Sequence, residues 1–164
     1  MTAPHPNAAT IERFYAAFDK LDSATMVAQY APDVTFSDPA FGELHGNEAG
    51  AMWTMLCGNA TDLSVVASDI QADDARGSAH WTARYTFTAT GRPVVNEIDA
   101  RFRFDGNGKI VEHRDSFSMF TWSKQALGPS AYLLGWNPIG HKVLQGKARG
   151  RLDEYLAKQA TAVP

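Results

Sequence analysis

The spacing of apolar residues changes along the chain from the period of a helix to the period of a strand. In the first third, apolar side chains recur every three or four residues and so share one helix face: Ile11, Phe14, Tyr15, Phe18 and Leu21. A cap at Asn7 would begin this helix, and a cap at Asp22 or Ser23 would begin a second, shorter one. The same period predicts a third helix over 49–57.

From Leu63 onward the period is two, which is typical of strands with one buried face. Turns rich in Gly, Asp and Asn separate the strands that we predict there, over 63–70, 78–90, 94–104 and 109–117. A short strand over 34–37 precedes them, after a break at Pro32, and a loop over 40–48 follows it. Helices first and an antiparallel meander afterwards predict an α+β domain.

The length of 164 residues suits one domain that needs no disulfide or metal to fold. We expect a flexible tail over 1–7, the main domain over 8–120, and a helical extension over 121–164 that packs on the same domain. Within the extension, helices are predicted over 122–127 and 143–156, and the stretch 132–136 between them is apolar.

Composition and charge narrow the range of partners. The net charge of −3 and the scattered Lys and Arg residues argue against nucleic acid, which requires a clustered positive surface. No apolar run reaches the length of a membrane-spanning helix, so we expect no membrane contact. The first residues lack the basic start and apolar stretch of a secretion signal, which predicts a cytoplasmic protein.

Metal and cofactor chemistry has little support in the sequence. Cys57 is the one cysteine, and its apolar context predicts a packed thiol. His45 and His80 are isolated and lack metal-ligand spacing, and there is no phosphate-cradling glycine loop or dinucleotide fingerprint. We therefore expect neither a metal nor a cofactor.

Two segments, RFYAAFDKLDSATMVAQYAPDVTFSDP and DGNGKIVEHRDSF, together with the strands between them, resemble the nuclear-transport-factor-2-like (NTF2-like) superfamily. Within it the chain is most similar to SnoaL-like and ketosteroid-isomerase-like proteins, over roughly residues 8–120. The resemblance implies a cone-shaped fold, in which three N-terminal helices pack into a strongly curved mixed or antiparallel sheet around an apolar pocket. It also implies a homodimer. The fold hosts isomerases, cyclases, epoxide hydrolases, dehydratases and binding proteins, so it does not fix the function.

Asp38 is the first candidate for catalysis. The stretch TFSDPAFG is similar to the isomerase segment that holds the general base. A carboxylate among Phe36, Pro39 and Phe41 would have a raised pKa and could take a proton from carbon next to a carbonyl. The alternative is that an Asp before a proline only shapes a turn.

His113 and Asp115 form the second candidate, because residues two apart in a strand face the same way. Two titratable groups on an apolar face are costly unless they are paired or used. They form either a satisfied pair that supports the sheet or an acid/base pair in the pocket. Asp115 resembles an acid of the epoxide hydrolases of this fold, but Trp81 and Ala83 stand where those enzymes have an Arg and an Asp.

The sequence also lacks a complete set of the hydrogen-bond donors that ketosteroid isomerases use to stabilise the substrate oxyanion. Phe14 stands at the position of their oxyanion tyrosine, with Tyr15 about 100° further round the helix. Asp99 alternates out of phase with Phe102, so we place it on an outer face that is solvated or at a dimer contact: Glu97, Asp99, Arg101 and Arg103. The sequence therefore argues against steroid isomerisation.

Several further residues on the inner faces would either line an apolar ligand site or form the core. The candidates for ligand binding are Tyr15, Phe36, Trp81, Tyr85, Asn96, Phe102 and Phe117.

The sequence thus predicts a small-molecule pocket protein. The leading hypothesis is a cofactor-free acid/base enzyme of the isomerase, cyclase or hydratase/dehydratase type on an apolar or polyketide-like substrate, with Asp38 as base and His113 and Asp115 as a second acid/base pair. One alternative is a non-catalytic binding protein for a small hydrophobic ligand in the same pocket. Another is a structural dimer whose pocket is filled by the apolar patch at 132–136.

Overall fold

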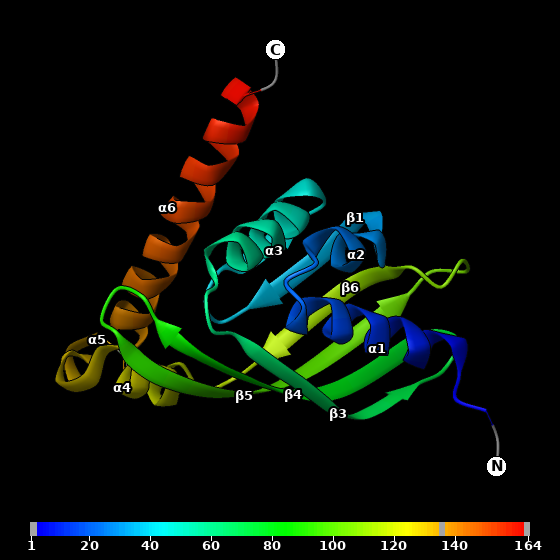
Figure 1. Cartoon of the computed structure of the whole chain (residues 1–164), viewed down its shortest axis with the longest axis horizontal. Helices are drawn as coiled ribbons and strands as arrows, with labels where there is room; N and C mark the ends of the chain where they lie inside the picture. The colour runs from blue at the N-terminus through cyan, green and yellow to red at the C-terminus, as the bar shows by residue number, and fades with distance from the viewer. Residues whose placement is uncertain (1–2, 135–136, 163–164) are drawn as a thin grey trace.

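Helices cover one face of a curved sheet, with a helical extension at one end (Figure 1). The computed structural model describes residues 3–134 and 137–162, apart from the side chains of residues 133 and 134. The first three helices are α1 (Pro6–Asp19), α2 (Ser23–Ala28) and α3 (Asn47–Asn59). The extension contains α4 (Met119–Leu127), a 3₁₀ turn (Gly128–Ser130), α5 (Ala131–Leu134) and α6 (Pro138–Ala162). In the described part of the chain, no helix combines the length and apolarity needed to cross a bilayer.

The sheet has six strands in the order β2-β1-β6-β5-β4-β3. They are β1 (Tyr30–Asp38), β2 (Gly42–His45), β3 (Ser64–Ala72), β4 (Arg76–Phe87), β5 (Arg92–Phe104) and β6 (Ile110–Ser116). β1 runs parallel to β6, and the other neighbouring strands are antiparallel. The predicted α+β class and mixed curved sheet are confirmed, and the strand order brings the N-terminal β1 beside the last strand.

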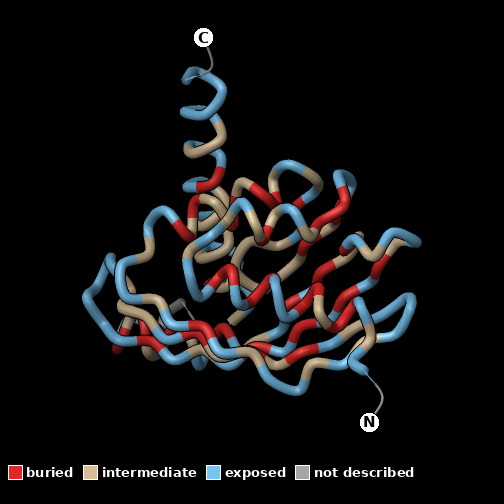
Figure 2. The backbone as a smooth tube through the Cα atoms, turned by 45° about the vertical axis from the view of Figure 1, so that its right-hand side comes forward, coloured by how far each residue is buried: buried red, intermediate tan, exposed pale blue. Residues whose placement is uncertain are grey.

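Burial alternates along the long strands as the sequence pattern predicts. On β5, Ile98, Ala100 and Phe102 are buried, whereas Glu97 and Asp99 are exposed. The buried positions face α1 and α3 and form one apolar core with them. Figure 2 shows that buried positions of the chain gather inside the molecule, between the sheet and the helices.

The structure differs from the prediction around β1 and β2. β1 begins at Tyr30 and runs through Pro32, where we predicted a break. Proline is tolerated there because β2 pairs only with the later part of β1, so this part of β1 is an edge that needs no amide donor. The predicted loop over 40–48 contains β2, which a tight turn with Gly42 at φ +73° brings back onto β1.

The first helix also starts earlier than predicted, at Pro6. The side chain of His5 caps it by accepting from the Asn7 amide, and Asn7 itself donates to the carbonyls of Asp73 and Asp74. The predicted cap of α2 at Asp22 is confirmed, since its carboxylate accepts from the Thr25 amide.

The extension packs on the main domain through α6, which is longer than the predicted 143–156. Leu152 of α6 is 0% exposed and belongs to the core. The last turns of α6 project beyond the body as exposed chain (Figure 2). Tyr132 is 64% exposed; the rest of the predicted apolar patch lies in residues that are not described or whose side chains are not described.

Candidate functional site

His113 lies at the centre of a buried chain of hydrogen bonds on the inner face of the sheet. Its ring is 0% exposed, with Nδ1 2.8 Å from the hydroxyl of Tyr30 and Nε2 2.9 Å from Oδ1 of Asp115. Trp53 donates to the Tyr30 hydroxyl at 2.8 Å, and Trp81 lies 3.4 Å from the same Asp115 oxygen as a second donor. The chain therefore joins α3, β1, β6 and β4.

The donors in this chain can be assigned from the groups present. The Trp53 indole can only donate, so the Tyr30 oxygen accepts from it. The hydroxyl proton of Tyr30 is then free to be donated to Nδ1 of His113. The ring then carries its proton on Nε2 and donates it to Asp115. Both ring nitrogens of His113 have a partner in this arrangement, and Oδ1 of Asp115 accepts from His113 and Trp81.

Aromatic rings enclose the imidazole of His113. The centroid of Phe102 lies 4.4 Å from it, that of Phe36 5.1 Å and that of Phe14 5.4 Å. His113 thus acts on its surroundings through Tyr30 and Asp115. Sequence reasoning missed Tyr30 and Trp53, neither of which is among the candidate site residues predicted above.

Asp38 ends β1 on the same inner face. The parallel register pairs Phe36 with His113 and Ser37 with Arg114, so Asp38 comes level with Asp115 on the neighbouring strand. Its Oδ1 accepts from the Phe41 amide at 2.5 Å, which closes the turn into β2. Both expectations for Asp38 therefore have a structural counterpart: it shapes a turn, and it faces inward beside a second carboxyl group.

The environment of Asp38 favours its neutral form. Burial, followed by the charge of Asp115, raises the pKa of Asp38 from 3.8 to about 7, against the opposing effect of the Phe41 and Ala40 amides. A carboxyl group with this pKa is partly ionised at neutral pH, which suits a general base.

Tyr15 carries a polar group that the fold leaves unused. The side chain is 2% exposed, and among the described residues its hydroxyl has no hydrogen-bond partner. Such a group costs about 1–3 kcal/mol unless something satisfies it. Burial and the charge of Asp115 raise the pKa of Tyr15 well above 10, so it remains a donor at any ordinary pH. Asp115 is thus the shared electrostatic neighbour of Asp38 and Tyr15.

The other predicted ligand-binding residues fall into two groups. Phe36, Trp81 and Phe102 are buried around the hydrogen-bond chain. The half-buried group consists of Tyr85, Asn96 and Phe117. The hydroxyl of Tyr85 accepts from Trp122 of α4 at 2.7 Å, so part of this group lies under the helical extension.

Asn96 differs from its neighbours on β5 in being polar on the inner face. It pairs with Ala83, two positions along β4 from Trp81. In the described residues its side-chain amide has no hydrogen-bond partner. The amide is therefore available to a ligand that reaches this end of the sheet.

Cys57 lies outside this region and is packed in the apolar core, as the sequence predicts. Cys57 packs with its Sγ 3.8 Å from the Met26 sulfur, and burial raises the pKa of its thiol to about 11, which is unsuited to a nucleophile. Within residues 3–134 and 137–162, no group of three His, Cys, Asp or Glu side chains is placed to hold a metal ion.

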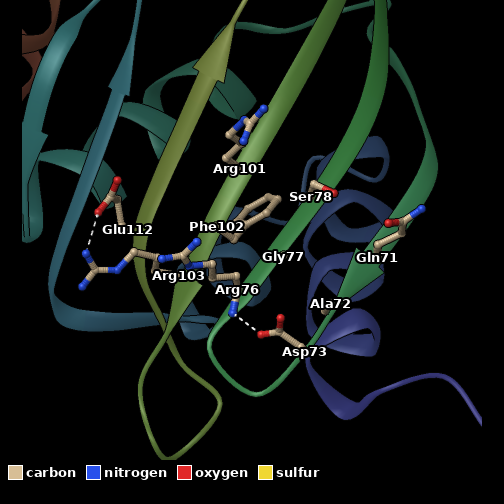
Figure 3. A pocket seen from close by; sticks show the side chains of 10 residues that line it. All are labelled: Gln71, Ala72, Asp73, Arg76, Gly77, Ser78, Arg101, Phe102, Arg103 and Glu112. Atoms are coloured by element: carbon tan, nitrogen blue, oxygen red, sulfur yellow. Dashed lines mark hydrogen bonds and ion pairs between the residues drawn. The ribbon is translucent and has the colours of Figure 1, made fainter.

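The outer face of the sheet carries a separate hollow, of about 480 Å³. Figure 3 shows Arg76, Arg101 and Arg103 around it, with Arg103 in an ion pair with Glu112 at 3.4 Å. Asp99 lies further along this outer face, where it bonds to His80 at 2.9 Å. The predicted outward orientation of Asp99 and the two β5 arginines is confirmed, and an isomerase-like role for Asp99 is excluded.

Residues 11–113 match the family model for the SnoaL-like domain, well over half of the chain. The chain belongs to the SnoaL-like domain family. The match begins within α1 and ends in the middle of β6; it includes Tyr15, Asp38 and His113, whereas Asp115 and the helical extension lie beyond it.

Solved structures agree with the SnoaL-like assignment. The chain is 23% identical to IdmH, a candidate polyketide cyclase from Streptomyces antibioticus, with a TM-score of 0.63 over 74% of this chain and 98% of that one. It is 21% identical to an LEH-like epoxide hydrolase from M. tuberculosis, with a TM-score of 0.62 over 77% of this chain and 94% of that one. A Catenulispora acidiphila protein with a ketosteroid isomerase-like fold, in complex with trimethylamine, is 17% identical, with a TM-score of 0.65 over 79% and 97%. At these identities the likeness establishes the fold.

Proposed function

We propose that this SnoaL-like protein is a cofactor-free acid/base enzyme that acts on a small apolar or polyketide-like carbonyl compound. The reaction class is isomerisation, cyclisation, hydration or dehydration. The observation that carries the proposal is the inward-facing Asp38, whose pKa is raised to about 7 beside Asp115. A carboxyl group poised near neutrality is costly to a fold and useful to a proton transfer.

In this mechanism Asp38 removes a proton from the carbon next to the substrate carbonyl. Negative charge then develops on the carbonyl oxygen, and the unpartnered Tyr15 hydroxyl donates a hydrogen bond to it. The proton on Asp38 returns to another carbon in an isomerisation, or to a leaving oxygen in a dehydration. Tyr15 takes over the donor role from the position now occupied by Phe14.

Asp115 is the second acid/base group of the proposed site. His113 holds its carboxylate through Nε2, and Tyr30 holds the ring from behind. Because aromatic rings enclose the imidazole, His113 acts as a positioning residue and proton relay behind Asp115. Apolar contacts to the substrate would come from the half-buried Tyr85 and Phe117 and from the other predicted ligand-binding residues.

The relatives are consistent with this chemistry. IdmH is described as a candidate cyclase of polyketides, which are rich in acidic C–H groups between carbonyls. Epoxide hydrolysis is not proposed, because Trp81 and Ala83 replace the Arg and Asp expected for it. The homodimer and the cytoplasmic location expected from the sequence are also part of the proposal, and sedimentation of the full chain tests the dimer.

The test uses 2-tetralone, an apolar bicyclic ketone, as a probe. We expect the protein to accelerate exchange of its α-hydrogens for deuterium in D₂O, followed by proton NMR. Asp38→Asn should abolish the acceleration, and Tyr15→Phe should reduce it by about 100-fold or more. Asp33→Asn, which removes an exposed carboxylate from the same strand, is the matched control and should exchange like the wild type.

Exchange no faster than in buffer, or equal exchange in Asp38→Asn, would contradict the enzyme proposal. If the ketone nevertheless binds saturably, the protein is a non-catalytic binding module that uses the same residues. The observation that favours this second function is that His113 is buried with a partner for each ring nitrogen, as expected of a histidine with a structural role.

A further inference from the structure

Helix α6 lies against the turn that follows Asp38, although 106 residues separate the two contacting positions. Nε2 of Gln145 donates to the carbonyl of Pro39 at 3.4 Å. Gly42 approaches the same side chain so closely that a Cβ there would lie 3.3 Å from its amide carbon. The amide of Gln145 therefore covers both the start and the end of the turn between β1 and β2.

Arg149, one helical turn further along α6, adds a second contact. Its Nη1 donates to the carbonyl of Glu43 at 3.3 Å, and its Nη2 forms an ion pair with Glu48 in the first turn of α3. Glu48 also accepts from the amide of His45 at 3.4 Å. Arg149 thus joins β2 and α3 to the helix.

These contacts belong to one face of α6 that is anchored in the core. Gln145, Arg149 and Leu152 are spaced four and three residues apart, which places them in one row. Leu152 is 0% exposed, and α6 packs beside α3 (Figure 1). The SnoaL-like match ends at residue 113, so this face lies wholly outside it.

We propose that α6 is a positioning strap, in which Gln145 and Arg149 hold the 39–43 turn so that the Phe41 amide remains on Asp38. The proposal rests on the proposed role of Asp38 as the base. The strap forms hydrogen bonds with the turn at the carbonyls of Pro39 and Glu43. The Phe41 amide, which donates to Asp38 at 2.5 Å, lies between these two contacts in the sequence. The turn can leave Asp38 only if these contacts break.

Release of the strap would have a defined electrostatic effect on Asp38. Burial is the largest cause of its raised pKa, and the Phe41 amide opposes it to a smaller extent. Opening of the turn would expose the Asp38 carboxyl group to water and, at the same time, break its hydrogen bond with the Phe41 amide. Because burial dominates, the titration midpoint of Asp38 should move down towards that of an ordinary carboxyl group.

The experiment compares the full-length wild type with Gln145→Ala, Arg149→Ala and Arg149→Lys. Arg151→Ala removes an exposed arginine of the same helix and is the matched control. Amide hydrogen exchange at Phe41 measures opening of the turn, ¹³C NMR of the Asp38 carboxyl group measures its titration, and urea unfolding measures global stability.

We expect Arg149→Ala to speed exchange at Phe41 by about tenfold beyond any change in global unfolding. Its Asp38 midpoint should fall by about one pH unit. Arg149→Lys keeps the charge facing Glu48, so both changes should be smaller than in Arg149→Ala. Gln145→Ala should also show smaller changes, and Arg151→Ala should show neither.

Unchanged Phe41 exchange and an unchanged Asp38 midpoint in both alanine variants would overturn the strap, as would changes that only follow global unfolding. Neither readout depends on turnover. A wild-type Asp38 that titrates near 4 would instead remove the base on which both proposals rest, so the two failures are distinguishable.

Discussion

Replacement of Asp38 by Asn should remove the contribution of this residue to the pH dependence of the free energy of unfolding. The pKa of Asp38 is raised on folding from 3.8 to about 7, so the folded state favours the protonated form. This contribution is fully present below the unfolded pKa and is lost as the pH rises through about 7. Each pKa unit corresponds to about 1.4 kcal/mol, so the whole effect is about 4 kcal/mol, of which about 3 kcal/mol falls between pH 5 and pH 8.

Asparagine has the same shape and keeps an oxygen that can accept from the Phe41 amide, but it carries no proton to titrate. The free energy of unfolding of Asp38→Asn relative to the wild type should therefore rise by about 3 kcal/mol from pH 5 to pH 8. Urea unfolding of both proteins at several pH values measures this difference, in which the titrating groups that do not interact with Asp38 cancel. Asp33→Asn controls for the loss of one carboxylate. A difference that stays constant to within about 0.5 kcal/mol would show that Asp38 ionises as freely in the folded protein as in the unfolded chain.

Three further predictions concern the rest of the molecule. His113→Leu leaves Tyr30 and Asp115 buried without their shared partner and should cost about 3–5 kcal/mol in urea unfolding; a loss below about 1 kcal/mol would contradict the hydrogen-bond chain. Leu152→Ala should cost about 2–5 kcal/mol, because the side chain is fully buried; a neutral result would show that α6 is not packed on the domain. The hydrogen bonds that His80 donates to Asp99 and then to Glu97 raise the pKa of His80, so its stabilisation is present below the unfolded pKa near 6.5 and lost at higher pH. At this exposed site the advantage of the wild type over His80→Gln should stay below about 1 kcal/mol at pH 6 and vanish at pH 9, and equal stability at both pH values would refute the ion pairs.

The inner face of the sheet was predictable because its signal is local. Alternation along β5 assigns Phe102 to the interior and Asp99 to the exterior, and the structure agrees. The spacing of His113 and Asp115 likewise puts them on one face, where they bond to each other. Periods of two and of 3.6 are encoded within a few residues, so they can be read without knowledge of the fold.

Contacts between distant segments were not predictable in this way. Tyr30 bonds to His113 across 83 residues, and no local pattern marks a tyrosine at a helix–strand junction as the partner of a buried histidine. Arg149 reaches Glu43 across 106 residues for the same reason. The two adjacent buried rings of α1 are a related case, because a helix that packs into a curved sheet buries a face wide enough to include both Phe14 and Tyr15.

The most direct test of the account is the pH profile of α-hydrogen exchange in 2-tetralone, with the rate of Asp38→Asn subtracted at each pH. If Asp38 is a partly desolvated base, the protein-dependent rate should rise with pH and level off after a midpoint at about 7. A midpoint near 4, or a profile that Asp38→Asn reproduces, would contradict the central claim that this carboxyl group performs the proton transfer.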